Sequence, residues 1–350
     1  MKKNDLIKLI ATGIVNWYED GQINGNLSKM PNELRRAINM LCARMPLPLI
    51  INNRTELVNV LSKPLGLLEL EGESKVYDEE VLISDGMPTD ICYELAIGEA
   101  DIHGNIEQSK ILDIMNELRV YGNEEDYVNI RGFIIEHPVV EESIIDHFIK
   151  KHTEYNIQLR KIYSKIKEFY EDIPQHVKQQ DKVNICKCCG WTIYQKKEST
   201  SCISSFCKTQ EGHKNAKSLK IDIGTKRLKR GAMRYLCFPG IPEIELKRKL
   251  EKKGLKVRIW PYFDLYDLEI SFNDEKWAID VKDYSSPYQL IEKVTSFPIT
   301  DCSNNFVVVP KRRTKLHKAY KKILKAEQTK GFSFIGEDDL IKYVNKKVIE

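Results

Sequence analysis

The sequence predicts a multidomain α+β protein with a mainly helical N-terminal half, a cysteine-rich middle and a C-terminal α/β sandwich around a mixed central sheet. Apolar residues recur at helical spacing near the N-terminus and again over 126–180. Five of the nine cysteines fall within the 22 residues 186–207. From residue 239 onward, helical and strand patterns alternate. A chain of 350 residues is long enough for two or three domains.

Most predicted elements of the N-terminal half are helices. One apolar face runs through the first 20 residues, and helices are expected to start after Pro31 and after Asn53. The acidic stretch 61–125 is broken by Gly and Pro and predicts short strands and turns. A long helix is expected from Tyr155 to Phe169.

Charge is divided unevenly along the chain. Residues 1–180 carry 20 Lys+Arg against 30 Asp+Glu, whereas residues 181–350 carry 35 against 21. A basic half predicts contact with a polyanion such as nucleic acid, and the alternative is a lysine-rich surface without a partner. No apolar run approaches the roughly 18–20 residues of a membrane span, and Lys8 interrupts the only N-terminal candidate, so a cytoplasmic location is expected.

The clustered cysteines form two knuckles separated by 12 residues. Cys186 and Cys189 are spaced C-x2-C, and Cys202 and Cys207 are spaced C-x4-C. Four thiolates on two tight turns can surround one tetrahedral ion, and Zn²⁺ suits them because it is soft enough for sulfur and redox-inert. We therefore expect a zinc ribbon over 181–222.

Two alternatives for the zinc ligands remain open at this stage. Cys188 could replace Cys189, and His213 could replace Cys207, because the second knuckle is wider than usual.

A basic run follows the ribbon and predicts a track for nucleic-acid phosphates. Its members are Lys226, Arg227, Lys229, Arg230 and Arg234.

The remaining boundaries follow from these patterns. We expect a mixed, mainly helical domain over 1–125, a helical segment over 126–180 and a nuclease-like α/β domain over 223–350. The last of these is predicted from a helix and three strands between Pro239 and Lys282. The expected elements are helix 242–253, strand 256–260, strand 265–272 and strand 276–282.

The predicted helix and the second and third predicted strands each carry an acidic residue that could belong to one site. Glu243 shares the inward face of the predicted helix, and Asp267 lies on the second strand. The period of two puts Asp280 and Lys282 on one face of the third strand. Carboxylates on adjacent strands suit Mg²⁺ or Mn²⁺. The ordinary alternative is an exposed strand with alternating charges.

Each of these residues could have a separate role in phosphodiester hydrolysis. Asp267 and Asp280 would hold the metal, Lys282 would orient or deprotonate the attacking water or stabilise the phosphate, and Glu243 would hold a second ion or a water. Downstream, the sequence predicts five further elements: a helix from Ser285, a strand over 306–309, a basic helix over 314–326, a strand near Phe332 and a helix over 337–347.

The phrases FPGIPEIEL, WPYFDLYDLEI and WAIDVKDYSSPYQL resemble the PD-(D/E)xK, or restriction-endonuclease-like, superfamily over about 236–350. Tyr266 stands where Pro often precedes the first strand acid. With the cysteine knuckle upstream, these phrases look most similar to the nuclease-like protein associated with the prokaryotic PIWI (Argonaute-like) defence module. That resemblance implies partnership with a PIWI protein and a helicase in defence against phage or plasmid DNA.

The resemblance carries metal-site roles onto Asp267, Asp280 and Lys282, with Glu243 as the helix acid. Gln289, expected to bind nucleic acid, is similar to an auxiliary glutamine of some branches, with a helix-surface residue as the alternative. Asp264 and Asp283 flank the site and could each substitute for a ligand. The expected function is a Mg²⁺-dependent DNA endonuclease, and many enzymes of this fold act as homodimers. Two rival functions stay open: a catalytically idle adaptor that binds nucleic acid, and an RNase with the same site.

Overall fold

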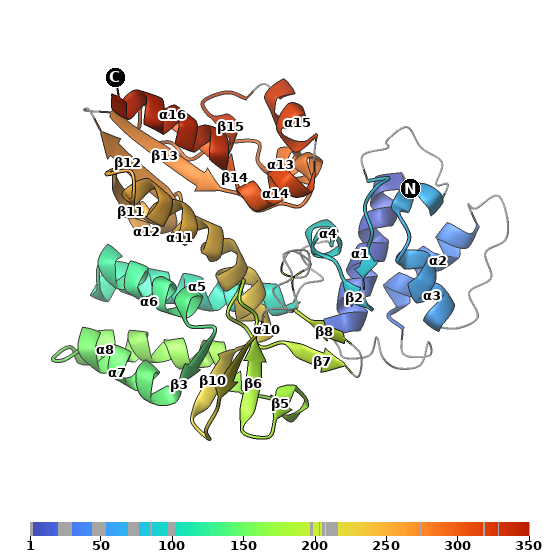
Figure 1. Cartoon of the computed structure of the whole chain (residues 1–350), viewed down its shortest axis with the longest axis horizontal. Helices are drawn as coiled ribbons and strands as arrows, with labels where there is room; N and C mark the ends of the chain where they lie inside the picture. The colour runs from blue at the N-terminus through green and yellow to red at the C-terminus, as the bar shows by residue number, and fades with distance from the viewer. Residues whose placement is uncertain are drawn as a thin grey trace. The chain divides into compact units, whose positions relative to one another are not determined.

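The computed structural model divides into two compact units (Figure 1). The first comprises Met1–Asn105 with Tyr284–Gln289, and the second comprises Ile106–Asp283 with Leu290–Glu350. The four predicted domain boundaries stay predictions. The structure describes residues 3–19, 30–43, 54–68, 77–84, 86–96, 102–196, 199–202, 204, 207, 216–272, 275–317, 319–327 and 329–349.

Helices form most of the described part of the first unit. They are α1 (Lys3–Glu19), α2 (Asn32–Cys42), α3 (Arg54–Leu61), the 3₁₀ helix Leu65–Leu68 and α4 (Asp90–Leu95). A short antiparallel pair, β1 (Ile83–Ser84) with β2 (Met87–Pro88), precedes α4. The predicted N-terminal helices are present because their apolar faces meet in one core, which includes Leu6, Ile10, Trp17, Leu34 and Leu41.

The second unit begins with helices and a small sheet. Its elements are most of α5 (Ile102–Tyr121), α6 (Glu124–Glu136), β3 (Val139–Glu141), α7 (Glu142–His152), α8 (Ile157–Ser164), the 3₁₀ helix Lys165–Phe169 and β4 (Tyr170–Asp172). A later strand, β10 (Thr225–Leu228), pairs antiparallel with both β3 and β4. The small sheet therefore joins residues before and after the cysteine-rich segment.

Two sequence predictions about this region are wrong. The stretch 61–125, expected to hold short strands and turns, contains the long helix α5, which buries Ile111, Ile114 and Leu118 at helical spacing. The single helix expected from Tyr155 to Phe169 ends at Ser164 and continues as a 3₁₀ helix and strand β4. Pairing of β4 with β10 supplies the backbone hydrogen bonds that a longer helix would have made.

The cysteine-rich segment is built from short strands. Strands β5 (Lys178–Gln179), β6 (Lys182–Ile185) and β9 (Lys217–Lys220) form one antiparallel sheet, and β7 (Tyr194–Lys196) pairs with β8 (Ser199–Ser201). The helical turns that follow are α10 (Arg230–Ala232) and the π-helix Met233–Cys237, which leads directly into α11 (Phe238–Glu251).

A five-stranded mixed sheet organises the C-terminal part. Its strands in spatial order are β11 (Lys256–Ile259), β12 (Leu268–Phe272), β13 (Glu275–Val281), β14 (Asn304–Val309) and β15 (Ser333–Gly336). The pairs β11–β12 and β12–β13 are antiparallel, and the pairs β13–β14 and β14–β15 are parallel. The mixed sheet expected from the sequence is thus present.

Helices cover both faces of this sheet (Figure 1). On α16 (Glu337–Ile349), Tyr343 stacks on Trp277 of β13, with ring centroids 5.1 Å apart. The other helices are α11, the short α12 (Pro261–Asp264), α13 (Pro287–Lys293), α14 (Lys311–Leu316) and α15 (Tyr320–Ala326). The predicted single basic helix over 314–326 is wrong, because His317 is extended and separates α14 from α15.

Strand β12 also starts later than the sequence predicts. Instead of extending from 265, the chain makes a tight turn in which Trp260, Tyr262, Phe263 and Asp264 all have positive φ angles between 49° and 68°. Non-glycine residues rarely adopt this conformation, and their clustering at one turn is typical of functional sites.

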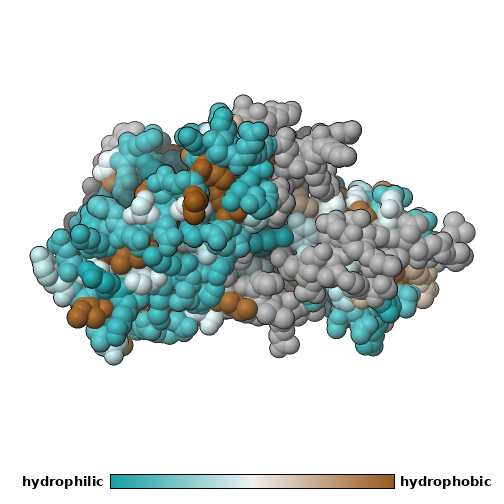
Figure 2. Space-filling model, turned by 90° about the horizontal axis from the view of Figure 1, so that it is seen from below, coloured by the Kyte–Doolittle hydropathy of each residue, from teal (hydrophilic) through white to brown (hydrophobic). Residues whose placement is uncertain are grey.

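The surface of the molecule is polar on the face drawn in Figure 2, where hydrophobic residues form separate small patches. None of the described helices combines the length and the apolar character that a bilayer crossing requires.

Helices α6 and α11 approach closely at a glycine. A Cβ on Gly240 would lie 2.8 Å from Ile135 Cγ1 and closer still to its Cδ1, whereas a Cβ on Gly132 would meet only Trp260, at 3.9 Å. We expect Gly240→Ala to destabilise the protein by about 1–3 kcal/mol. The matched change Gly132→Ala should be neutral or stabilising by up to ~1 kcal/mol. Urea unfolding followed by circular dichroism measures both, and equal stabilities would contradict this packing.

Candidate nuclease and metal sites

Strand register brings the predicted acids to one face of the sheet. Leu268 pairs with Ile279, so Asp267 and Asp280 fall side by side at the next position. Trp277 and Ile279 share the face that α16 covers, and therefore Asp280 and Lys282 face the opposite side, toward α11. The predicted sharing of one face by Asp280 and Lys282 follows directly from this alternation.

Asp267 is buried, and its carboxylate is fixed to the neighbouring strand. Its Oδ2 accepts a hydrogen bond of 2.6 Å from the backbone N–H of Val281. Burial raises the pKa of Asp267 well above its usual range, and the nearby carboxylates of Glu243 and Asp280 raise it further. A buried carboxylate beside two others is a position where a cation would be strongly stabilised.

Lys282 supplies one positive charge to these acids. Its Nζ lies 2.7 Å from Asp280 Oδ1, and its backbone N–H donates to the carbonyl of Val308. Burial by itself would lower the pKa of Lys282, but Asp267 and Asp280 outweigh it and raise the pKa. The ammonium group therefore stays protonated beside the carboxylates.

Glu243 is held by two residues that sequence reasoning missed. Arg131 of α6 lies 3.0 Å from Glu243 Oε2 and 3.3 Å from Oε1, and the indole N–H of Trp260 donates to Oε2 at 2.5 Å. The Glu243 side chain is only 3% exposed. Burial raises the pKa of Glu243, whereas the Arg131 guanidinium opposes that shift.

Arg131 also binds the tight turn before β12. It pairs with the carboxylate of Asp264, and the hydroxyl of Tyr127, one helical turn earlier on α6, lies 3.2 Å from both groups. Glu124 of the same helix face accepts the backbone N–H of Tyr262 at 2.9 Å. One face of α6 thus holds the strained turn and the helix acid together.

The four predicted site residues are therefore brought together with Asp264 nearby. Within the described residues, the carboxylates of this cluster do not form a group of three ligand atoms that lie within 4.8 Å of one another. The donor set nevertheless fits a hard divalent cation, because Asp267 and Asp280 present oxygens from adjacent strands amid an excess of negative charge.

Asp283, a predicted substitute ligand, is fully engaged elsewhere. Its carboxylate accepts hydrogen bonds from Arg313 Nε at 2.9 Å and Arg312 Nε at 3.0 Å. Two guanidinium groups neutralise this acid, so we leave Asp283 out of the metal site that we propose.

The predicted phosphate-binding residues differ in their surroundings. Arg227 is 4% exposed, lies over the Trp191 ring with its guanidinium 4.7 Å from the centroid, and bonds Thr192 and Glu171. The Arg227 guanidinium is therefore not available to bind a phosphate, and we leave Arg227 out of the proposed phosphate track. Lys226 pairs with Asp172 at 2.7 Å near the surface. Lys229, Arg230 and Arg234 are partly exposed around α10 and the π-helix.

Gln289 belongs to the first unit and is fully buried there. Its amide nitrogen donates to the hydroxyl of Tyr77. Nearby, Glu94 accepts both the backbone N–H and the hydroxyl of Ser285 at 2.8 Å. These contacts give the predicted role of Gln289 in nucleic-acid binding no support.

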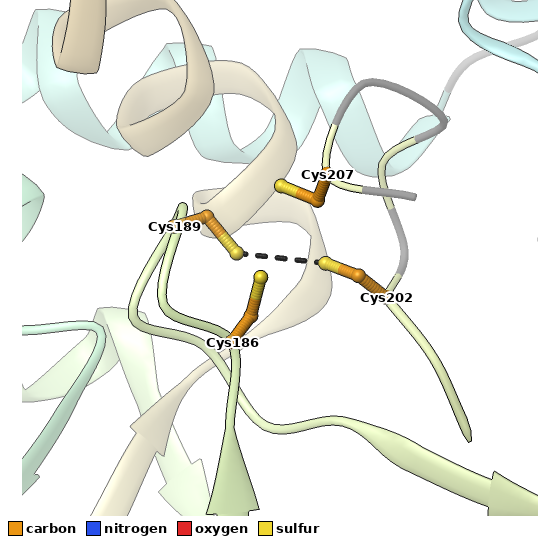
Figure 3. Close-up of side chains that lie close together, drawn as sticks. All are labelled: Cys186, Cys189, Cys202 and Cys207. Atoms are coloured by element: carbon orange, nitrogen blue, oxygen red, sulfur yellow. Dashed lines mark hydrogen bonds between the residues drawn. The ribbon is translucent and has the colours of Figure 1, made fainter. Parts of the chain in front are cut away.

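The four predicted zinc ligands converge on one point (Figure 3). The sulfurs of Cys186, Cys189, Cys202 and Cys207 all lie within 4.8 Å of one another, and all four side chains are buried. The sulfurs of Cys189 and Cys202 lie 3.5 Å apart. Tetrahedral zinc with bonds of about 2.3 Å needs sulfurs about 3.8 Å apart, so the group can hold such an ion.

Local backbone structure explains the first knuckle. The N–H of Cys186 donates to the carbonyl of Trp191, and that of Gly190 donates to the carbonyl of Cys186, both at 2.8 Å. Gly190 has φ +73°, which an L side chain rarely adopts. Interactions among these thiols lower the pKa of Cys186 and raise the pKa of Cys189 and of Cys207, so their protons are shared unequally within the group.

Of the two alternative zinc ligands, only Cys188 lies among the described residues. Cys188 is half-buried and lies outside the group of four sulfurs, and His213 lies outside the described residues. The geometry therefore selects Cys189 over Cys188 and shows that Cys207 can complete the set.

Metal analysis tests this assignment. We expect purified wild-type protein to carry one zinc ion per chain and Cys186→Ser/Cys202→Ser to carry none, because two of four thiolates are lost. Cys188→Ser is the matched control and should keep its zinc. Mass spectrometry of the metal content gives the ratios. Full zinc in the double variant, or loss of zinc in the control, would contradict the ligand set.

Comparison with known proteins agrees with this geometry. Residues 240–350 match the family model described as "REase associating with pPIWI_RE", so this part of the chain is a restriction-endonuclease-like domain. Residues 6–141 match a second model, "pPIWI_RE three-gene island domain Y". No curated protein and no solved structure gives a match.

Together the two matches identify the chain as a restriction-endonuclease-like protein associated with pPIWI, and the resemblance drawn from the sequence is confirmed. The nuclease match begins at Gly240 and includes Glu243, Asp267, Asp280 and Lys282. Arg131 lies in the other matched stretch, so no motif around the nuclease residues could have indicated it.

Proposed function

We propose that this protein is a metal-dependent endonuclease that hydrolyses DNA phosphodiesters. The observation that carries the proposal is the convergence of Glu243, Asp267, Asp280 and Lys282 from one helix and two strands inside a restriction-endonuclease-like domain. A catalytically idle adaptor would have no physical reason to keep three buried or half-buried acids and a lysine so close, because like charges destabilise the fold.

The residues have distinct tasks in the proposed reaction. Asp267 and Asp280 would hold Mg²⁺ or Mn²⁺, which polarises the scissile phosphate and makes water a better nucleophile when bound. Lys282 sits 2.7 Å from Asp280, where its ammonium group can orient the attacking water and stabilise charge on the phosphate. Glu243, fixed by Arg131 and Trp260, holds negative charge on the other side of Asp267.

The family descriptions suggest the setting of this chemistry. They place the matched families with pPIWI_RE in a three-gene island. We therefore propose that the protein acts with a PIWI (Argonaute-like) partner and a helicase in prokaryotic defence against phage or plasmid DNA. The zinc-binding cysteines would stabilise the segment between β4 and β10, and a homodimer would allow both strands to be cut.

Cleavage assays test the catalytic assignment. With Mg²⁺ or Mn²⁺, we expect wild-type protein to cut plasmid DNA, and we expect Asp280→Ala and Lys282→Ala each to lower the rate by at least about 100-fold. Glu245→Ala removes an exposed acid from the same helix as Glu243 and should leave the rate unchanged.

The same assay separates the rival functions. Folded wild-type protein that cuts neither DNA nor RNA with either metal would indicate the idle adaptor. Cleavage of RNA alone would indicate an RNase. Equal rates for wild type, Asp280→Ala and Lys282→Ala would show that the cleavage comes from another protein.

DNA binding tests the proposed phosphate track. The logarithm of the binding constant should fall linearly with the logarithm of salt concentration, and Lys229→Gln/Arg230→Gln should reduce that slope by about 1.8 if both residues contact phosphates. Fluorescence anisotropy with a labelled duplex measures the slope. Lys252→Gln/Lys253→Gln removes equal charge from the exposed end of α11 and serves as the control. Equal slopes for both double variants would contradict the track.

A further inference from the structure

Arg131 stands where a second metal ion would be needed to neutralise the helix acid. Its guanidinium bonds both carboxylate oxygens of Glu243 and also pairs with Asp264, and it lies over the Trp260 ring at 4.6 Å from the centroid. The side chain is 11% exposed. A buried, fully charged group held by three partners has little freedom to move away.

The charges around the site point to the same conclusion. Four carboxylates face one another here: Glu243, Asp264, Asp267 and Asp280. With all four carboxylates ionised, as they would be around a bound divalent ion, Arg131 and Lys282 offset two of the four negative charges, which leaves two, the amount that one divalent ion neutralises.

Neighbouring acids do not alter this balance. Glu269 is neutralised by Arg258 at 3.1 Å and accepts the hydroxyl of Tyr266 at 2.7 Å. The carboxylate of Asp283 is paired with both Arg312 and Arg313, so it adds no negative charge to the centre. A second divalent ion would leave the centre positively charged and would face the Arg131 guanidinium at Glu243.

We propose that Arg131 takes the place of a second divalent ion, so that the nuclease centre binds one ion, at Asp267 and Asp280, and Glu243 is held by the guanidinium. The inference rests on the proposed function. It also means that α6, which lies within the stretch matching domain Y, supplies a positioning residue to the restriction-endonuclease-like domain.

Counting bound Mn²⁺ tests this inference on the full-length protein with its zinc content measured. Electron paramagnetic resonance of free Mn²⁺ during a titration gives the number of ions per chain, and Asp280→Ala identifies those bound at the nuclease centre. We expect one Mn²⁺ per chain that is lost in Asp280→Ala. Two ions lost in that variant would overturn the inference and leave the proposed function standing. No ion at the centre would overturn the proposed function, and the inference with it.

Substitutions of Arg131 sharpen the test. Arg131→Met removes the charge but keeps a long side chain, and we expect it to bind two Mn²⁺ per chain, whereas Arg131→Lys should bind one. The control Arg227→Met removes another buried arginine that lies over a tryptophan, at 4.7 Å, and should still bind one. A folded Arg131→Met protein that binds a single ion would overturn the inference. If that variant does not fold, the counts for wild type and Arg131→Lys decide.

Discussion

The ion pair between Arg131 and Glu243 is the interaction on which the rest of the nuclease centre depends. It joins α6 to α11 and, through Asp264 and Trp260, to the turn that precedes β12. Removing one partner of a buried pair typically costs about 3–5 kcal/mol, because the other charge stays buried without compensation. The helix acid and the turn before β12 are therefore fixed relative to one another by a single guanidinium.

The turn at 260–264 is the costly part of this arrangement. Four of its non-glycine residues have positive φ angles, and such positions cost on the order of 1–3 kcal/mol each. Hydrogen bonds from one face of α6 offset part of that cost, since Glu124 binds the backbone of Tyr262 and Tyr127 binds Asp264. The turn also orients the indole N–H of Trp260 toward Glu243, and it leads into β12 so that Asp267 lies beside Asp280 of the neighbouring strand.

Local pattern was sufficient to predict the parts that depend on neighbours in sequence. Alternation placed Asp280 and Lys282 on one face of β13, and knuckle spacing placed Cys186 beside Cys189. Pattern failed where distant residues decide the structure. Arg131 is 112 positions from Glu243, and the left-handed turn ending at Asp264 is stabilised by a helix that no local motif connects to it. The split between α14 and α15 likewise has no local signal, because no Gly or Pro interrupts the lysine-rich stretch 311–326.

We propose that Asp267 and Asp280 hold a divalent ion beside Lys282 in a centre that Arg131 completes. Anomalous diffraction from crystals grown with Mn²⁺ tests it most directly, because manganese and zinc absorb at different X-ray energies. We expect one manganese peak within about 2.0–2.3 Å of carboxylate oxygens of Asp267 and Asp280, and one zinc peak among the four cysteine sulfurs. Manganese bound to Glu243 in place of Arg131, or absent from both aspartates, would contradict it.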